Sequence, residues 1–151
     1  MPKGSNETVL IKGKAMLIIR KTYLGNRTFE NAVQRAIGDF LQNAHSTQFR
    51  EQNWAPKCDI FESDAAIVVF IELPGVDERD VQIAFDSDSG IMAVMGRREA
   101  NTVEGRRRVL QMEMPSGDFE KVLRVNVPLH ENSILAQLSQ GILKITLPKY
   151  L

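Results

Sequence analysis

Residue types that would mark many protein classes are scarce in this chain of 151 residues. It has one cysteine, Cys58, so no disulfide can form within the chain, and we expect a reducing compartment. The 19 basic and 19 acidic residues leave no net charge, which disfavours a general attraction to nucleic acid or to an anionic membrane. The longest apolar run near the N-terminus, 15–19, is too short for a signal peptide or a membrane span. We therefore expect a cytoplasmic protein.

Patterns typical of catalysis and of metal binding are also missing. The two histidines, His45 and His130, are not spaced with each other or with Cys58 as metal ligands usually are. The sequence has no glycine-rich phosphate loop and no GxSxG nucleophile motif. Asp86 and Asp88 lie in a predicted turn, where aspartate hydrogen-bonds to the backbone. We expect no enzyme activity, no cofactor and no metal.

Two basic clusters, 97–98 and 106–108, are the remaining candidates for a nucleic-acid site. They have no interleaved aromatic residues on which bases could stack. Ion pairs with carboxylates of another subunit explain them better, so we expect no nucleic-acid partner.

The first 53 residues differ in character from the rest and are predicted to form an N-terminal arm. Within it, the segment 28–45 carries apolar residues at the i, i+3, i+4, i+7 spacing of one helical face, with Thr28 as a plausible N-cap. The opposite face is polar, so this amphipathic helix needs a partner for its apolar stripe. The stripe comprises Phe29, Val33, Ile37, Phe40 and Leu41, with alanines between them.

From Trp54 onward the hydrophobic period changes from 3.6 to 2, which is typical of strands. Alternating or buried-strand patterns cover 58–63, 65–73, 80–86, 91–97, 119–127, 134–139 and 142–147, separated by turn signals such as Pro74-Gly75 and Gln140-Gly141. The strand at 91–97 is apolar on both faces, with Ile91, Ala93 and Met95 opposite Met92 and Val94. Short strands without helical crossovers predict an antiparallel β-sandwich of the immunoglobulin-like type over 54–149.

The connection between Gly96 and Asp118 is longer than compact domains usually tolerate without structure. Its middle, "RRVLQMEM", alternates as a strand does. Such a segment can pair with the sheet edge of another subunit. A surface loop with accidental alternation explains the pattern equally well at this point.

Five motifs in order resemble the α-crystallin domain of small heat-shock proteins. They are "WAPKCDIFES" from Trp54, "IELPGV" from Ile71, "MAVMGRRE" from Met92, "SGDFEKVLRVNVP" from Ser116 and "AQLSQGILKITLPK" from Ala136. The resemblance covers about 54–149, and the ordered set is far more specific than any one motif.

The resemblance implies an ATP-independent holdase that keeps non-native client proteins from aggregating until ATP-dependent refolding chaperones act on them. It also implies a homodimer, and higher oligomers, in which a strand on the long loop is exchanged between subunits. By that match the dimer strand is Arg107, Arg108, Val109, Leu110, Gln111, Met112, Glu113 and Met114. We expect the arm's stripe to bind clients, to be buried against a neighbouring arm in the oligomer, or to do both in alternation.

The family also has a groove between two edge strands that accepts a branched-apolar pair from a neighbour's C-terminal tail. On this sequence the groove residues are Val81, Ile83, Phe85, Ile134, Ala136 and Leu138. The chain departs from the family at Lys121, where arginine is usual, and at Met114. Two residues follow Lys149 in this sequence, so we expect 150–151 to be a vestigial C-terminal extension without the usual tail motif.

Two pairs in the arm, Val9 with Ile11 and Leu17 with Ile19, place branched side chains on one face of an extended chain. We expect them to be candidate ligands for the groove by β-augmentation, although disorder or client binding explains them equally well. A non-catalytic co-chaperone of the p23/CS type shares the fold and lacks the swapped strand. A structural assembly protein is the other alternative.

Overall fold

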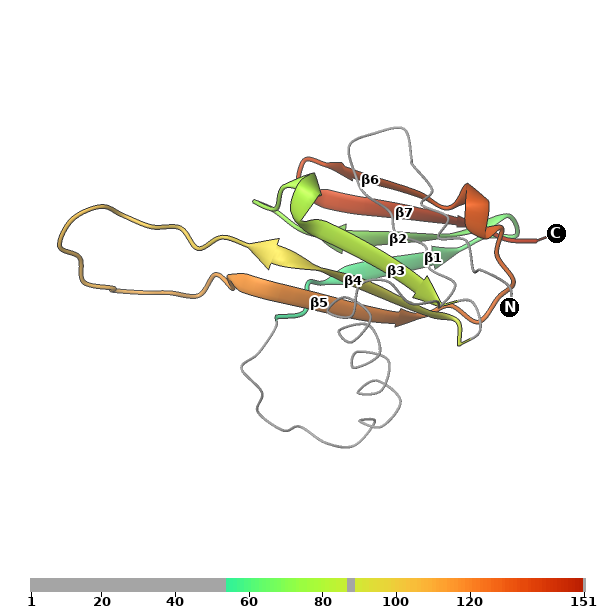
Figure 1. Cartoon of the computed structure of the whole chain (residues 1–151), viewed down its shortest axis with the longest axis horizontal. Coiled ribbons are helices and arrows are strands. Elements are labelled where there is room, and N and C mark those ends of the chain that lie inside the picture. Colours follow the sequence, from blue (N-terminus) through green and yellow to red (C-terminus); the bar gives the residue numbers. More distant parts are fainter. Residues whose placement is uncertain (1–53, 87–88, 151) are drawn as a thin grey trace, which may run out of the picture.

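Seven strands form two antiparallel sheets packed face to face (Figure 1) in residues 54–86 and 89–150, the part of the chain that the computed structural model describes. One sheet has the order β1-β2-β7-β6 and the other the order β3-β4-β5. The predicted antiparallel β-sandwich is confirmed. The bounds are β1 Cys58–Glu62, β2 Ala66–Glu72, β3 Val81–Asp86, β4 Ile91–Arg98, β5 Gly117–Arg124, β6 Leu135–Ser139 and β7 Ile142–Pro148.

Tight turns connect the strands of the hairpins, because the turn residues have the backbone angles and hydrogen bonds that such turns require. Gln140 and Gly141 between β6 and β7 both have positive φ, at 50° and 77°, as a type I′ hairpin turn requires. Between β1 and β2 the Ser63 hydroxyl donates to the Ala66 carbonyl and accepts from the Ala66 amide. Two short 3-10 helices, η1 Glu78–Asp80 and η2 Glu131–Ser133, precede β3 and β6.

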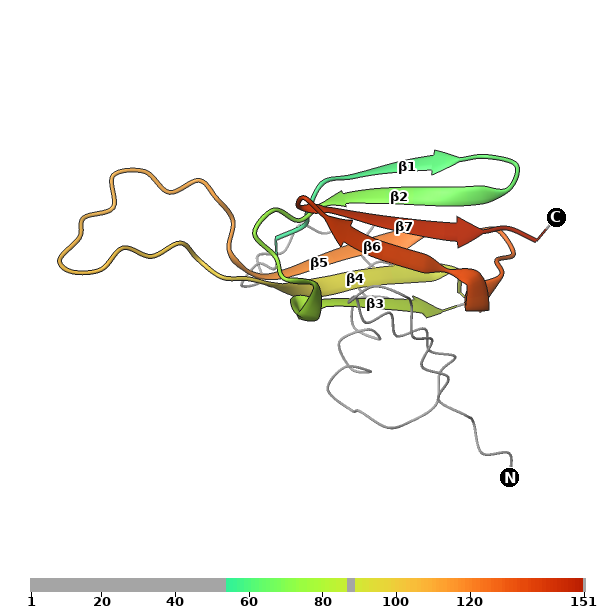
Figure 2. The same cartoon turned by 90° about the horizontal axis from the view of Figure 1, so that it is seen from above.

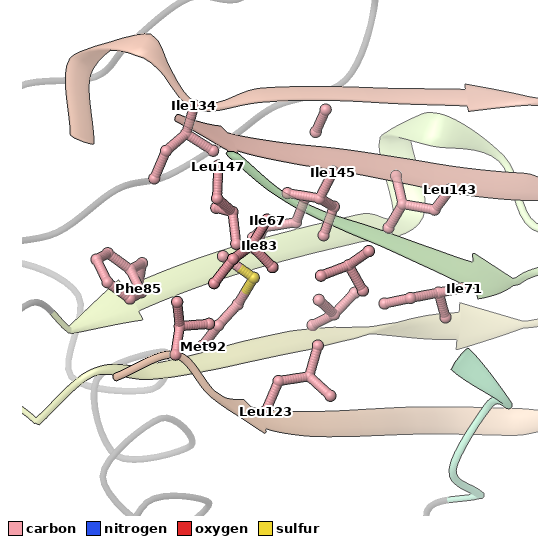
Figure 3. Packing of buried hydrophobic residues seen from close by; sticks show 14 of the residues in the cluster. Ile67, Ile71, Ile83, Phe85, Met92, Leu123, Ile134, Leu143, Ile145 and Leu147 are labelled. Atoms are coloured by element: carbon pink, nitrogen blue, oxygen red, sulfur yellow. The ribbon is translucent and has the colours of Figure 1, made fainter. Parts of the chain in front are cut away.

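The core lies between the sheets and is built from alternate residues of β2 to β7, with the half-buried Cys58 of β1 packed against it (Figure 3). On β2 the residues Ile67, Val69 and Ile71 point inward and are buried. Leu143 of β7 lies beside Ile71 in the same sheet, and Met92 of β4 packs from the opposite sheet. The period-2 pattern in the sequence is therefore the pattern of core burial.

Gly96 near the end of β4 makes room for the largest fully buried side chain, Phe119 of β5. A Cβ at position 96 would lie 2.1 Å from the Asp80 carbonyl oxygen and 2.5 Å from the Phe119 ring. Only glycine fits at this close approach.

The connection between β4 and β5, residues 99–116, extends well beyond the end of the sheets (Figure 2). Within the described residues, no helix has the length and hydropathy needed to cross a membrane.

Candidate interaction surfaces

The segment 107–114 lies on the projecting loop, and each of its residues is exposed. Its apolar side chains are largely exposed to solvent: Leu110 is 82% exposed and Met112 is 71% exposed. Within this single chain the segment forms no strand. The exchange of this strand with another subunit stays a prediction.

Arg98, the last residue of β4, holds the base of this loop. Its Nε donates to the Pro115 carbonyl at 2.9 Å, its Nη2 donates to the same oxygen, and its Nη1 donates to the Pro74 carbonyl at 3.1 Å. The guanidinium also lies 4.3 Å from the centre of the Trp54 ring, a cation–π contact. One side chain thus joins both ends of the loop to the β2–η1 connection.

Trp54 fixes the point at which the N-terminal arm meets the sandwich. Its amide donates to the Asp118 carbonyl at 3.2 Å, and its carbonyl accepts from the Glu120 amide at 3.1 Å, so it pairs with the outer edge of β5. Its indole N–H donates to the Gly117 carbonyl, and its ring packs against Phe119 with centroids 5.4 Å apart. The edge of β5 is therefore partly occupied by the chain's own backbone.

The neighbouring Arg97 forms ion pairs within its own chain. Arg97 donates to Asp118 and to Glu99, each at 3.0 Å. Pairing of the 97–98 cluster with carboxylates of another subunit stays a prediction. The hydrogen bond to Asp118, and then that to Glu99, raises the pKa of the Arg97 guanidinium above its usual value. The carbonyl-binding role of Arg98 had no signal in the sequence, because Pro74 and Pro115 are distant along the chain.

The outer edge of β1 exposes apolar side chains on both of its faces. Ile60 lies on the same side as the buried Val69, to which it is paired, yet it is exposed at the margin of the core. Phe61 points to the outer face and makes an edge-to-face contact with Phe70 at 6.0 Å. Within the described residues this edge has no strand beside it.

The predicted groove residues lie on β3 and next to or on β6, which are the edge strands of the two sheets. Val81, Ile83, Phe85, Ile134 and Ala136 are all buried in the core, and Leu138 is half-buried. In this chain the two strands thus present their backbone edges rather than those five side chains. Peptide binding at this place stays a prediction.

The end of the described chain is held against the sandwich. Lys149 forms an antiparallel bridge with Leu129, and its Nζ donates to the Glu62 carboxylate at 2.8 Å and to the Ser63 carbonyl. The Tyr150 amide donates to the Pro128 carbonyl. The predicted client-binding stripe Phe29, Val33, Ile37, Phe40 and Leu41, and the predicted groove ligands Val9, Ile11, Leu17 and Ile19, lie outside the described residues.

The chemistry that the described surfaces offer is apolar contact and backbone pairing. In residues 54–86 and 89–150, no group of three histidine, cysteine, aspartate or glutamate side chains is placed to hold a metal ion. The same residues include no buried charged or polar side chain of the kind that active sites use. These surfaces are suited to binding other polypeptides.

Comparison with known proteins gives a consistent result. Residues 59–151 match the Hsp20/alpha crystallin family. The chain is 32% identical over 126 residues to heat shock protein 16 of Schizosaccharomyces pombe, covering 80% of this chain and 85% of that protein. It is 27% identical over 122 residues to small heat shock protein C2 of Rickettsia felis, covering 79% and 78%.

Solved structures of similar proteins agree. Heat shock protein 16.0 from Schizosaccharomyces pombe superposes with a TM-score of 0.57 at 31% identity, covering 64% of this chain and 88% of that one. A small heat-shock protein from Xylella fastidiosa, described as having a distinct high order structure, superposes with a TM-score of 0.58 at 27% identity, covering 66% and 90%.

Proposed function

The chain belongs to the Hsp20/alpha crystallin family of small heat-shock proteins, and from this premise we propose that it assembles by exchanging the segment 107–114 between subunits. Members of the family are non-catalytic, ATP-independent holdase chaperones that form oligomers and bind unfolded clients. The family match therefore favours a holdase over a co-chaperone of the p23/CS type or a purely structural protein.

The observation that carries the proposal is the exposed apolar alternation of the loop. In an extended backbone Leu110, Met112 and Met114 point to one face, while Gln111 and Glu113 point to the other. All three apolar residues are exposed in the single chain. An amphipathic strand of this kind is stabilised when it is added to a sheet that has an apolar face.

The edge of β1 is the acceptor that fits best. The edge of β5 is partly occupied by Trp54, and the side chains of β3 at its edge are already buried in the core. Among the described strands, β1 offers an unpaired backbone edge with an exposed apolar residue on each face, Ile60 on the inner side and Phe61 on the outer side. The other edge of this sheet, β6, exposes Leu135 on its outward face, whereas its inward residues Ala136 and Leu138 are buried or half-buried. Leu110 and Met112 of a second subunit would cover Ile60, and full burial contributes roughly 1.5–3 kcal/mol for each such side chain.

We also propose that the arm's stripe captures clients. A holdase acts by mass action: it binds apolar surface on a partly unfolded chain and lowers the free concentration of the aggregating species. Phe29, Val33, Ile37, Phe40 and Leu41 would supply that surface, in the cytoplasm, where the lone Cys58 stays reduced and ATP-dependent chaperones can refold released clients.

The exchange is tested with two double variants of the full chain. Leu110→Ser with Met112→Ser removes the apolar face of the segment, and Gln111→Ser with Glu113→Ser changes the polar face as a matched control. We expect the first variant to weaken dimers by roughly 100-fold or more in native mass spectrometry, since it removes about two buried side chains per interface half. The control should keep the wild-type mass distribution.

Suppression of the heat-induced aggregation of a thermolabile enzyme is measured in parallel. Because the substituted residues are exposed in the subunit, the circular dichroism spectrum should not change. If the variant at positions 110 and 112 assembles as the wild type does, the segment is not the assembly strand and the proposal is wrong.

A further inference from the structure

The outer face of the three-stranded sheet is apolar and buried. Ile91 and Ala93 of β4 are each 1% exposed, and Ala84 of β3 is 5% exposed. The register places Ala84, Ala93 and Val122 in one row across the three strands. We call Ala84, Ile91, Ala93 and the half-buried Met95 and Val122 the outer patch.

These residues do not belong to the core between the sheets. The core side of β4 is formed by Met92 and Val94, so its neighbours Ile91 and Ala93 point away from the core. The outer face of an antiparallel sheet usually meets water. On the other sheet it does, since Phe61 is 59% exposed and Leu135 is 55% exposed on the outward side.

The described elements do not account for the burial of the outer patch. The four-stranded sheet covers the inner face of β3, β4 and β5, which is the face away from the outer patch (Figures 1 and 2). The loop 99–116 extends past the end of these strands and does not lie over the patch. A β-branched side chain such as Ile91 reaches 1% exposure only with other atoms packed over it. A covering segment is therefore required.

We propose that the outer patch is the docking site of the arm's own amphipathic segment, 28–45. The sequence predicts that the apolar stripe of this segment needs a surface to cover it. The length of the segment also matches the sheet, since 18 residues of helix span about 27 Å and the eight residues of β4 span about 26 Å. Three strands are about 14 Å wide, enough for one helix of about 10 Å diameter. The small side chains of Ala84 and Ala93 allow a helix to approach closely along the middle of the sheet.

The path of the chain favours the same occupant. Trp54 is paired with the edge of β5, which belongs to this sheet. The linker 46–53 can reach at most about 26–29 Å when extended, which suffices to return from the β5 edge to the outer patch. A covering segment from the same chain thus needs no special arrangement of subunits.

A docked arm has a regulatory consequence, and this consequence rests on the proposed client-binding role of the stripe. While 28–45 covers the outer patch, both apolar surfaces are hidden from clients. Release of the arm exposes the stripe and the outer patch together.

Ala93→Lys in the full chain tests the docking, because it places a charge in the middle of the outer patch without entering the core. Ala66→Lys is the matched control, since Ala66 lies on the outer face of the other sheet. Hydrogen exchange followed by mass spectrometry should show at least roughly tenfold faster exchange in peptides from 28–45 for Ala93→Lys only. Unchanged exchange in a folded Ala93→Lys variant overturns the proposal.

A near-isosteric pair identifies the occupant even if the lysine variant fails to fold. In a Cys58→Ser background, Ala93→Cys is combined with Ile37→Cys and treated with a short bismaleimide. A cross-linked product of monomer mass supports docking of the chain's own arm. A product of dimer mass, or no cross-link, overturns it.

Aggregation assays at low temperature separate this inference from the proposed function. Faster exchange in 28–45 together with higher holdase activity supports both the docking and the client-binding role. Faster exchange with unchanged activity supports the docking and contradicts the client-binding role of the stripe.

Discussion

The strand β4, Ile91–Arg98, and the loop segment 107–114 have the same length and a similar share of apolar residues, yet they differ in burial and in strand pairing. In β4 the first four residues are buried, while every residue of the segment is exposed. The difference lies in their neighbours: β4 is hydrogen-bonded to β3 on one side and to β5 on the other. The segment has no strand beside it within the described chain.

This comparison shows that alternation specifies a potential strand, and that an adjacent edge decides whether the strand forms. The sandwich satisfies its pattern internally. The loop carries a pattern that a single subunit leaves unsatisfied, which is the property expected of an assembly element. Three further predictions test this contrast between the sandwich and the loop.

The largest effect is expected from adding one methyl group inside the sandwich. Gly96→Ala would push a Cβ against the Asp80 carbonyl and the Phe119 ring, so we expect a loss of about 3 kcal/mol and a melting temperature lower by about 10 °C or more. The same change in the loop, Gly105→Ala, meets no atom within 4 Å, and we expect a much smaller shift although its φ is positive. Thermal unfolding followed by circular dichroism compares the two. Equal shifts would contradict the contrast.

An intermediate effect is expected at the base of the loop. Arg98→Gln removes the bonds to Pro115 and Pro74 and the contact with Trp54, so the melting temperature should fall by a few degrees. The loop would also leave the sandwich in less defined directions, and we expect dimers to dissociate several-fold more readily. Dilution experiments in native mass spectrometry measure the second effect. A variant that loses stability but keeps dimer affinity would show that Arg98 does not orient the loop.

The smallest effect is expected at Arg97, the residue before Arg98. Arg97 makes two exposed ion pairs, and Arg97→Gln should change the melting temperature by less than about 2 °C. The raised pKa of Arg97 means that its pairing contribution is present below the ordinary guanidinium pKa and is lost only above it, in strong alkali. Melting curves between pH 6 and 9 should therefore show no transition attributable to Arg97. An effect as large as that of Arg98→Gln would contradict the assignment of loop control to Arg98.

The sequence predicted all seven strands of the described sandwich because burial on one face leaves a period of two that can be read directly. β2 and β7, for example, begin and end within one or two residues of the predicted segments. Turn chemistry set the ends, as at Gln140 and Gly141. The local pattern was sufficient to place each strand, even for β2 and β7, which pair in the sheet although they lie far apart in the sequence.

Contacts between distant parts of the chain could not be predicted in this way. The bonds of Arg98 to Pro74 and Pro115 depend on where two loops meet after folding, and nothing in the spacing of these residues indicates it. The burial of five groove residues likewise depends on how the two sheets pack. The apolar character of Ile91 and Ala93 was visible in the sequence, but the sequence did not indicate that the outer face of their sheet would be covered.

The contact between Arg98 and Trp54 brings two attachment points together. The Arg98 guanidinium lies over the ring of Trp54, where the arm joins the sandwich, and binds the carbonyl of Pro115, at the end of the loop 99–116. A movement of either segment therefore displaces a side chain that also holds the other segment. If the segment 107–114 assembles the subunits and the arm captures clients, as proposed, a substitution of Arg98 should alter both activities.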